Sequence, residues 1–195
     1  MAQHANRMHV LLVCTANLCR SPLAEHLARA GLAGCDDVVV SSAGLVATEG
    51  TAMDPLAAVE LRRRGLDPSA FRTRRLTADL VGTAHLVHVA SRRQRAAVAE
   101  LDPQAVLRTF TVPELARHAL ALQPADLPSA PTAERLLALV DVAGACRGTL
   151  PPVRPTDDDV ADPYRRGAAA MQECASLLAR HTAAWTELVT ASAEG

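Results

Sequence analysis

The sequence predicts an α/β protein that folds as a single domain. Short apolar runs alternate with stretches whose apolar residues recur at helical spacing, as is typical of strands and helices that follow one another along a chain. The chain has 195 residues, of which 49% are hydrophobic, so it can bury one sizeable core. No internal repeat or low-complexity tract divides residues 1–195.

Each expected element has its own signal. The predicted elements are a strand at 8–13, a helix at 22–33, a strand at 38–41, a helix at 54–64, a strand at 85–90, a helix at 92–101, a strand at 106–111 and a last helix at about 167–190. Residues 10–13 form a continuous apolar run, as expected for a strand buried on both faces. Pro22 suits the first turn of the helix that follows. Met171, Trp185 and Leu188 recur at helical spacing, which predicts that the last helix packs on the sheet.

Residues 14–21 lie between the carboxyl end of the first strand and the amino end of the first helix. Ligands bind at this place in open parallel sheets, and the free N–H groups of a helix start attract anions. A helix start also favours the nucleophilic thiolate form of a cysteine, so Cys14 is the candidate nucleophile. Arg20 has the planar fork that matches two phosphate oxygens, and the Ser21 hydroxyl can donate to the thiolate. The pattern predicts a phosphate cradle that contains a nucleophile.

The same residues resemble a known family. Residues 14–22 read Cys-Thr-Ala-Asn-Leu-Cys-Arg-Ser-Pro, similar to the Cys-x-Gly-Asn-x-Cys-Arg-Ser signature of the low-molecular-weight protein tyrosine phosphatases. Ser42-Ala43-Gly44 resembles the Ser-Ala-Gly that closes the second strand in that family. The resemblance covers about residues 8–115 and 157–190. It implies a three-layer sandwich with a four-stranded parallel sheet, helices on both faces and a phosphate loop after strand 1.

The resemblance also implies a mechanism. Cys14 would attack phosphorus to give a cysteinyl-phosphate, and Arg20 would hold the phosphate oxygens. The residues expected to bind phosphate or support the loop are Thr15, Ala16, Asn17, Leu18, Cys19 and Ser21. Ala16 stands where the family usually has glycine, which requires a negative φ there. In the family the second loop cysteine can form a reversible disulfide with the nucleophile, so Cys19 is either that partner of Cys14 or a small buried residue.

A general acid is expected near the other end of the chain. Asp162-Pro163-Tyr164 resembles the family's Asp-Pro-Tyr loop, in which the acid protonates the leaving oxygen and the aromatic residue lines the substrate slot. The neighbouring acids Asp157, Asp158 and Asp159 compete by proximity alone. We favour Asp162 because Pro163 stiffens its backbone and Tyr164 lies beside it.

The substrate slot is expected to contain Leu18, Tyr164 and Ala47. Ala47 replaces an aromatic residue that many tyrosine-specific members carry three positions before the glycine that aligns with Gly50. Leu18 is an aliphatic residue, as in tyrosine phosphatases, whereas relatives that act on phosphoarginine tend to have threonine there. The resemblance therefore predicts a phosphotyrosine protein or a small aryl phosphate as substrate. The alternatives are a phosphoarginine phosphatase or an arsenate reductase on the same fold, or a phosphate-binding module without catalysis.

One segment, at about 119–156, has no counterpart in the minimal family pattern. Its prolines are Pro124, Pro128, Pro131, Pro151, Pro152 and Pro155, and a helical stretch with an apolar stripe lies between them. We expect an inserted helix that packs on the surface; a rim over the slot is the alternative, because the segment leads directly into residues 157–164.

Composition excludes several classes of function. A net charge of −1 and a pI of about 6.6 argue against binding of nucleic acid or an anionic membrane. The apolar run at 10–14 is too short for a signal peptide, and the odd number of cysteines argues against a disulfide framework, so a cytoplasmic protein is expected. The seven histidines lack the spacing of metal ligands, and thiolate chemistry on phosphate esters needs no metal or cofactor.

Overall fold

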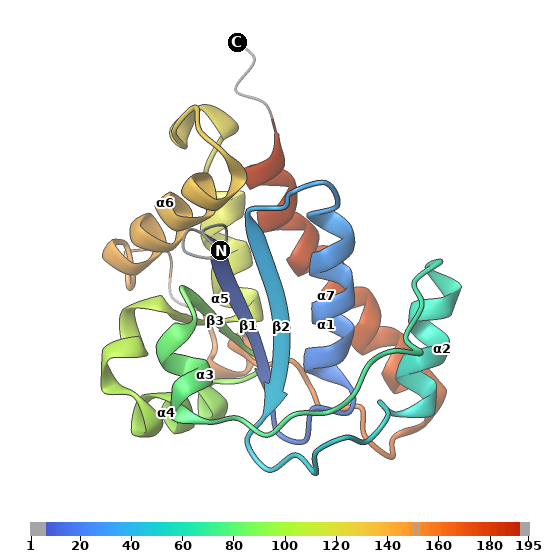
Figure 1. Ribbon diagram of the computed structural model, residues 1–195. Coiled ribbons are helices and arrows are strands. Elements are labelled where there is room, and N and C mark those ends of the chain that lie inside the picture. The colour runs from blue at the N-terminus through green and yellow to red at the C-terminus, as the bar shows by residue number, and fades with distance from the viewer. Residues whose placement is uncertain (1–6, 150, 152, 192–195) are drawn as a thin grey trace, which may run out of the picture.

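The computed structural model describes residues 7–149, 151 and 153–191 of the chain (Figure 1). Its strands are β1 (Met8–Cys14), β2 (Val38–Gly44), β3 (Leu86–Val89) and β4 (Thr109–Thr111). They form one parallel sheet in the order β2-β1-β3-β4, with Val10 of β1 paired to Val40 and to Leu86. The predicted four-stranded parallel α/β fold is confirmed, and β1 lies at the centre of it.

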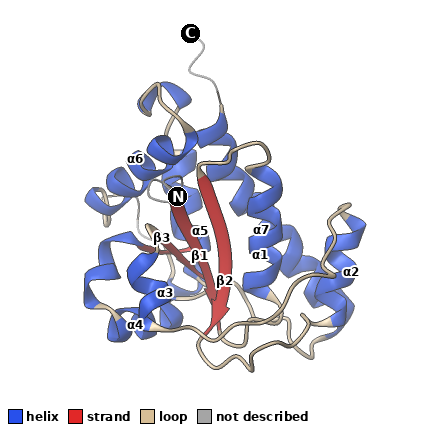
Figure 2. Ribbon diagram, viewed as in Figure 1, coloured by secondary structure: helices blue, strands red, loops and turns tan. Residues whose placement is uncertain are grey.

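The sheet has a hydrophobic core on each face. The helices are α1 (Arg20–Gly31), α2 (Pro55–Arg63), α3 (Ala78–Thr83), α4 (Arg92–Leu101), α5 (Val112–Leu120), α6 (Thr132–Ala145) and α7 (Gly167–Thr190). Alternation along β1 sends Val10 and Leu12 into the larger core with α1, α5 and α7, and sends Leu11 and Val13 into the smaller core with α3 and α4. Figure 2 shows these helices on both sides of the strands. No helix of the described residues combines the length and apolar character that a membrane span requires.

Several expected elements differ in extent. The helix predicted at 22–33 begins two residues earlier, so Pro22 lies in its first turn as expected. The strand predicted at 106–111 keeps only Thr109–Thr111, because residues 103–108 form a 3-10 helix that the Asp102 side chain caps. Helices α3 and α5 were not predicted. The short turn at α3 carries little periodicity, whereas α5 starts directly at the end of β4 through a capping box of Thr111 and Glu114.

The proline-punctuated segment forms α6, which packs near the amino ends of β1 and β2. The N–H of Ala133 donates to the Asp37 carboxylate at 2.7 Å, just before β2 begins. Buried Arg135 donates from Nε to the Val189 carbonyl at 2.9 Å and from Nη1 to the Pro128 carbonyl at 2.8 Å. The Arg135–Val189 bond joins α6 to the carboxyl end of α7, far along the strands from Cys14. The expected surface helix therefore lies at the amino ends of the strands, whereas the phosphate loop lies at their carboxyl ends.

Candidate active site

The loop between β1 and α1 folds around the sulfur of Cys14. Cys14 ends β1 and is 2% exposed. Its Sγ accepts the backbone N–H of Asn17 at 3.3 Å and the hydroxyl of Ser21 at 3.0 Å. Both donors stabilise a thiolate more than a thiol, because a charge-assisted hydrogen bond is stronger than a neutral one.

The loop leaves several backbone donors free for an anion. Within the described residues, the N–H groups of Thr15, Ala16, Leu18 and Cys19 have no hydrogen-bond acceptor. They come directly before α1, whose first-turn N–H groups add to the positive potential. All four residues line one cavity, so their free N–H groups are placed to donate to an anionic ligand that enters it.

Asn17 holds the shape of this cradle from inside. It is fully buried and has a φ of +57°, a conformation that asparagine tolerates better than most residues. Its Nδ2 donates to Ser21 and to Ser42, each at 2.8 Å, and its Oδ1 accepts the backbone N–H of Arg74 at 2.9 Å. The positive φ falls on Asn17 and leaves Ala16 outside the left-handed region, so alanine is accommodated where the family signature has glycine.

Gly44 provides the space behind the loop. It ends β2 beside Cys14, and a Cβ placed there would lie 2.6 Å from the Asn17 nitrogen and 2.9 Å from the Thr15 oxygen. Both contacts are to backbone atoms, which cannot move aside by rotation of a side chain. The Ser42-Ala43-Gly44 sequence thus supplies a hydroxyl to Asn17 and then a position without a side chain.

Arg20 connects the cradle to the distant acidic loop. Its Nη2 lies 2.6 Å from Asp162 Oδ2, and its Nη1 donates to the Val160 carbonyl at 3.2 Å. The Arg20 side chain is 7% exposed and that of Asp162 is 48% exposed. Arg20 Nε has no acceptor within the described residues. The candidate acid and the candidate phosphate-binding arginine therefore meet across the mouth of the cradle.

The acidic loop is docked by a few contacts to the rest of the site. The N–H of Val160 donates to the Ala90 carbonyl at 2.8 Å, at the carboxyl end of β3. Asp159 accepts the backbone N–H of Arg92 at 2.7 Å, and Asp158 pairs with Arg117 of α5 at 2.6 Å. Thus Asp158 and Asp159 serve as anchors, whereas the neighbouring Asp162 carboxyl reaches Arg20.

A cavity of about 250 Å³ opens above the sulfur. Its lining residues are Cys14, Thr15, Ala16, Leu18, Cys19, Arg20, Asp162 and Tyr164. The Tyr164 ring is 43% exposed and stacks against the Arg165 guanidinium, whose carbon lies 5.1 Å from the ring centre. Ala47 does not belong to this lining: it is 5% exposed, and its N–H bonds to the carbonyl of Gly44.

Two contacts to the loop were not anticipated from the sequence. Gln94 of α4 is buried, and its Nε2 donates to the Thr15 hydroxyl at 3.1 Å. Thr15 in turn accepts from Arg20 Nη2 at 3.4 Å. Arg74 supplies the N–H that Asn17 accepts. The one available signal was that Gln94 lies in the first turn of a helix that follows a parallel strand, and such turns meet at the carboxyl edge of the sheet.

The cysteines differ sharply in environment. All five are free thiols. Burial raises the pKa of Cys19 well above its ordinary range, and the nearby Asp54 carboxylate acts in the same direction. Burial also raises the pKa of Cys174, on α7, to about 12. Both therefore stay neutral thiols at pH 7. No cluster of three or more His, Cys, Asp and Glu side chains suited to a metal occurs among the residues that the structure describes.

Comparison with known proteins decides the family. The model of the low molecular weight phosphotyrosine protein phosphatases matches residues 9–123, which is more than half of the chain. The chain belongs to this family. Its members are cysteine-dependent hydrolases of phosphomonoesters, and the sequence resemblance predicted that class.

Relatives of this phosphatase match between about half and nearly all of its length. The "probable low molecular weight protein-tyrosine-phosphatase EpsP" of Ralstonia nicotianae is 28% identical over 182 residues, or 93% of this chain and 96% of the relative. A protein-arginine-phosphatase of Geobacillus stearothermophilus is 34% identical over 53% of this chain and 68% of its own length. The crystal structure of the Erwinia amylovora tyrosine phosphatase AmsI superposes with a TM-score of 0.68 at 21% identity, covering 98% of this chain and 99% of that one. The phosphatase therefore has the fold of this solved structure over the residues that the structure describes.

Proposed function

We propose that this phosphatase hydrolyses phosphotyrosine in proteins through a phosphoenzyme on Cys14. The observation that carries the proposal is the placement of the Cys14 sulfur beneath four free backbone N–H groups, with the Ser21 hydroxyl and the Asn17 N–H directed at it. A phosphate monoester dianion needs such donors when it meets an anionic nucleophile, because they offset the repulsion between the two charges.

In the first step the Cys14 thiolate attacks phosphorus, a sulfur–phosphorus bond forms, and the bond to the phenolic oxygen breaks. Arg20 and the loop amides hold the other three oxygens while charge redistributes over them. Asp162 gives its proton to the leaving oxygen, since a phenol with a pKa of about 10 leaves poorly as an anion. The resulting Asp162 carboxylate then takes a proton from the water that attacks phosphorus, which releases phosphate and restores the thiolate stabilised by Ser21.

The Arg20–Asp162 contact of 2.6 Å supports this division of roles. The same guanidinium that would bind two phosphate oxygens already reaches the carboxyl group of the acidic loop. A bound phosphate would therefore lie within range of Asp162 without a large movement of that loop. Phosphate also competes with the carboxylate for Arg20, which frees Asp162 to carry a proton to the leaving group.

An aromatic leaving group fits the walls of the cavity. Tyr164 offers a ring face at the mouth, and the aliphatic side chain of Leu18 lines the loop side. A flat phenol can pack between such surfaces. Phosphoarginine is the second candidate, because the Geobacillus relative is named a protein-arginine-phosphatase.

We also assign the chain to the cytoplasm, where the five free thiols stay reduced. We treat residues 1–195 as one phosphatase domain with an insertion at 119–156.

The test is a side-by-side rate measurement on a phosphotyrosine peptide, a phosphoarginine peptide and a small alkyl phosphate. We expect kcat/KM to be highest for phosphotyrosine and Cys14→Ser to abolish turnover of all three. A preference for phosphoarginine would assign the second candidate. An active Cys14→Ser protein would exclude the cysteinyl-phosphate mechanism altogether.

A further inference from the structure

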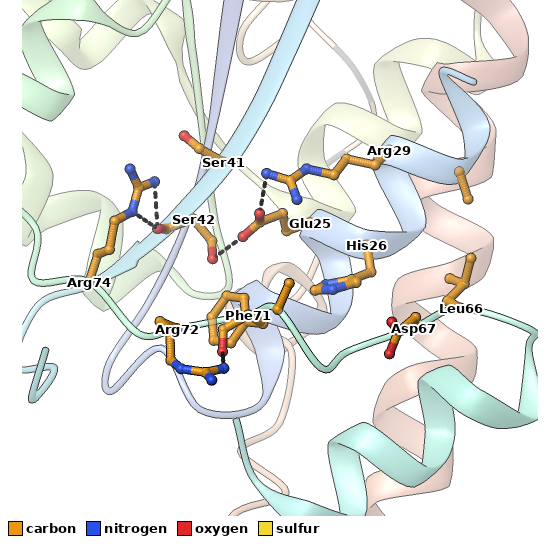
Figure 3. Close-up of a pocket in the computed structure, with 12 residues that line it drawn as sticks. Glu25, His26, Arg29, Ser41, Ser42, Leu66, Asp67, Phe71, Arg72 and Arg74 are labelled. Carbon is orange, nitrogen blue, oxygen red and sulfur yellow. Dashed lines mark hydrogen bonds and ion pairs between the residues drawn. The ribbon is translucent and has the colours of Figure 1, made fainter. Parts of the chain in front are cut away.

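A second, larger cavity lies beside the free edge of the sheet. It has a volume of about 620 Å³, within the range of small-molecule sites. Its lining residues are Glu25, His26, Arg29, Ala30, Ser41, Ser42, Leu66, Asp67, Ala70, Phe71, Arg72 and Arg74 (Figure 3). They come from α1, from edge strand β2 and from the segment that follows α2. None of them lines the cavity at Cys14.

Three arginines give this edge cavity an excess of positive charge. Arg29 binds the Val40 carbonyl through Nε and Nη2, and Arg74 binds the Ser42 carbonyl through the same two atoms. Arg72 uses Nη1 on two nearby carbonyls. A guanidinium has five N–H donors, so each arginine retains donors without an acceptor among the described residues.

The carboxylates of the edge cavity are already engaged. Buried Glu25 accepts the Ser42 hydroxyl at 2.5 Å and pairs with Arg29 at 2.6 Å, and Figure 3 shows it between those two residues. Asp67 accepts the backbone N–H of Ser69 at 2.9 Å and the Ser69 hydroxyl at 2.7 Å. Within the described residues, Arg72 and Arg74 form no ion pair with either acid. The cavity therefore has three guanidinium groups against two carboxylates, and the two guanidiniums without an acidic partner favour an anion beside them.

We propose that the edge cavity binds a small organic anion with two or more acidic groups, and that this ligand acts as an effector of the phosphatase. Two acidic groups suit the arrangement because the positive charges come from two places: Arg72 and Arg74 lie in the segment between α2 and α3, and Arg29 lies on α1. The buried Phe71 ring and the His26 ring, with centroids 5.9 Å apart, supply a less polar wall for the carbon skeleton of the ligand.

Two residues that line the edge cavity, Ser42 and Arg74, form hydrogen bonds with Asn17, which shapes the phosphate loop. Ser42 accepts a hydrogen bond from Asn17 Nδ2, and the backbone N–H of Arg74 donates to Asn17 Oδ1. Asn17 in turn donates its backbone N–H to the Cys14 sulfur. An anion that draws Arg29 away from Glu25, or that restrains Arg74, changes the partners of Asn17. It thereby acts on the thiolate without entering the active site.

Binding is tested directly with citrate, which carries only carboxylates, and with phosphoglycolate, which carries a phosphate and a carboxylate. The Cys14→Ser protein is used with phosphoglycolate so that the ester is not hydrolysed. Amide shifts of residues 26, 41 and 71–74 in NMR titrations report the edge cavity. The response of one probe or of both identifies which acidic group the cavity prefers.

Two variants test the edge cavity, one by removing its charge and one by filling its space. Arg72→Gln/Arg74→Gln removes the charged donors, and Ala70→Trp fills the space from an exposed position. Arg93→Gln/Arg180→Gln is the matched control, since both arginines are exposed and make no side-chain hydrogen bond with the described residues. We expect each cavity variant to weaken binding at least about tenfold and the control to bind normally.

The proposal is overturned if neither probe shifts the cavity amides, or if binding survives in either cavity variant. Survival in Ala70→Trp would indicate a charged surface patch, and survival in Arg72→Gln/Arg74→Gln would indicate that the arginines are not the ligands. An unchanged thermal unfolding temperature in each variant shows that loss of binding is not loss of fold.

The effector role rests on the proposed role of Cys14, so it has a separate readout. At constant ionic strength, saturating ligand should change kcat for an aryl phosphate by about fivefold in the wild type. Competition for the active site would raise KM and leave kcat unchanged. Ser42→Ala should still bind the probe, and its kcat should respond less. An unchanged wild-type kcat would reject the effector role while the binding result stood.

Discussion

The two halves of the active site are held in different ways. The cradle is organised around Asn17, which is fully buried and whose side-chain amide donates to the neutral hydroxyls of Ser21 in α1 and Ser42 in β2. The acidic loop at 157–164 is more exposed, and charged contacts hold it, among them Arg117–Asp158 and Arg20–Asp162. The Asp162 side chain is 48% exposed.

This difference separates two tasks of the catalyst. The cradle must present fixed donors to phosphate, and buried neutral hydrogen bonds keep them fixed without sensitivity to salt. The acidic loop must exchange a proton and release a product, and exposed ion pairs hold it more weakly because water and salt screen them. Changes in the cradle should therefore abolish chemistry on phosphorus, whereas changes in the loop should affect mainly the leaving group.

The largest effects are expected from the two reacting side chains. Cys14→Ser should remove turnover completely, because no covalent intermediate can form at a useful rate. Asp162→Asn should lower kcat by about 10²- to 10⁴-fold for a phenolic substrate, since proton transfer to the leaving oxygen is lost. The loss should shrink for an aryl phosphate whose phenol is strongly acidic. Rates across a series of aryl phosphates measure this dependence.

Asp157→Asn is the matched control for the acid. Asp157 lies in the same loop, but it is exposed and pairs with Arg154 at the surface. Its substitution should leave kcat unchanged. If Asp162→Asn had the same effect on every leaving group, Asp162 would not be the general acid.

The next effect tests the backbone beneath the cradle. Gly44→Ala places a methyl group 2.6 Å from the Asn17 nitrogen, so the loop must shift. We expect kcat/KM to fall by about 10²-fold and the free energy of unfolding to fall by about 1 to 3 kcal/mol. Activity assays and urea unfolding measure the two quantities.

Gly82→Ala is the control for that substitution. A Cβ at Gly82, in α3, meets no heavy atom within 4 Å. Alanine there should leave activity unchanged and raise stability slightly, because alanine favours a helix. A Gly44→Ala protein with normal activity would show that the loop tolerates displacement and that catalysis does not need a fixed cradle.

The cradle could be predicted from the sequence because its signals are local. A buried strand, a cysteine, an arginine six positions later and a proline in the first helical turn all lie within residues 10–22. Once these residues form β1 and α1, chain geometry alone brings Cys14, Arg20 and Ser21 together. The alternation of strands and helices likewise predicted a parallel sheet, which the structure confirms.

Long-range contacts could not be predicted in the same way. Nothing near Thr15 in the sequence points to Gln94, and nothing near Asn17 points to the backbone of Arg74. Ala47 was expected in the slot by its spacing from Gly50, yet it is buried outside the cavity lining. The strand expected at 106–111 was too long because its apolar residues also suit the 3-10 turn that precedes β4.

A smaller effect is expected at the anchor of the acidic loop. Arg117→Gln removes the ion pair with Asp158. The Arg117 side chain is 31% exposed and that of Asp158 is 15% exposed. Such a pair contributes about 1 kcal/mol, so kcat should fall by about fivefold through poorer docking of the loop. The affinity for inorganic vanadate should stay unchanged, because the cradle is untouched. Measurement of kcat reports the acidic loop, and the inhibition constant for vanadate reports the cradle.

Arg154→Gln provides the control for that anchor. Arg154 pairs with Asp157 in the same loop but is 83% exposed, so its loss should not change kcat. Raising the salt concentration should lower the wild-type kcat toward that of Arg117→Gln. A parallel loss of vanadate affinity in Arg117→Gln would show that the two halves are not separable.

The smallest effect on activity, and a distinct effect on stability, is expected at His88 in β3. Complete burial lowers the pKa of His88 to about 4, and its ring lies edge-on to Trp185 with centroids 6.1 Å apart. Between pH 6.5 and about 4 the unfolded chain binds a proton at this histidine and the folded chain does not. The free energy of unfolding should therefore fall with decreasing pH in that window, by up to about 3 kcal/mol from His88 alone.

Urea unfolding of the wild type and of His88→Gln at several values between pH 7 and pH 4.5 measures this contribution. The variant should be less stable at pH 7 and should lose less stability on acidification, while kcat at pH 7 stays near that of the wild type. His181, whose pKa burial also lowers, should account for part of the slope that remains. An unchanged slope in His88→Gln would show that the acid sensitivity of the fold does not arise at His88.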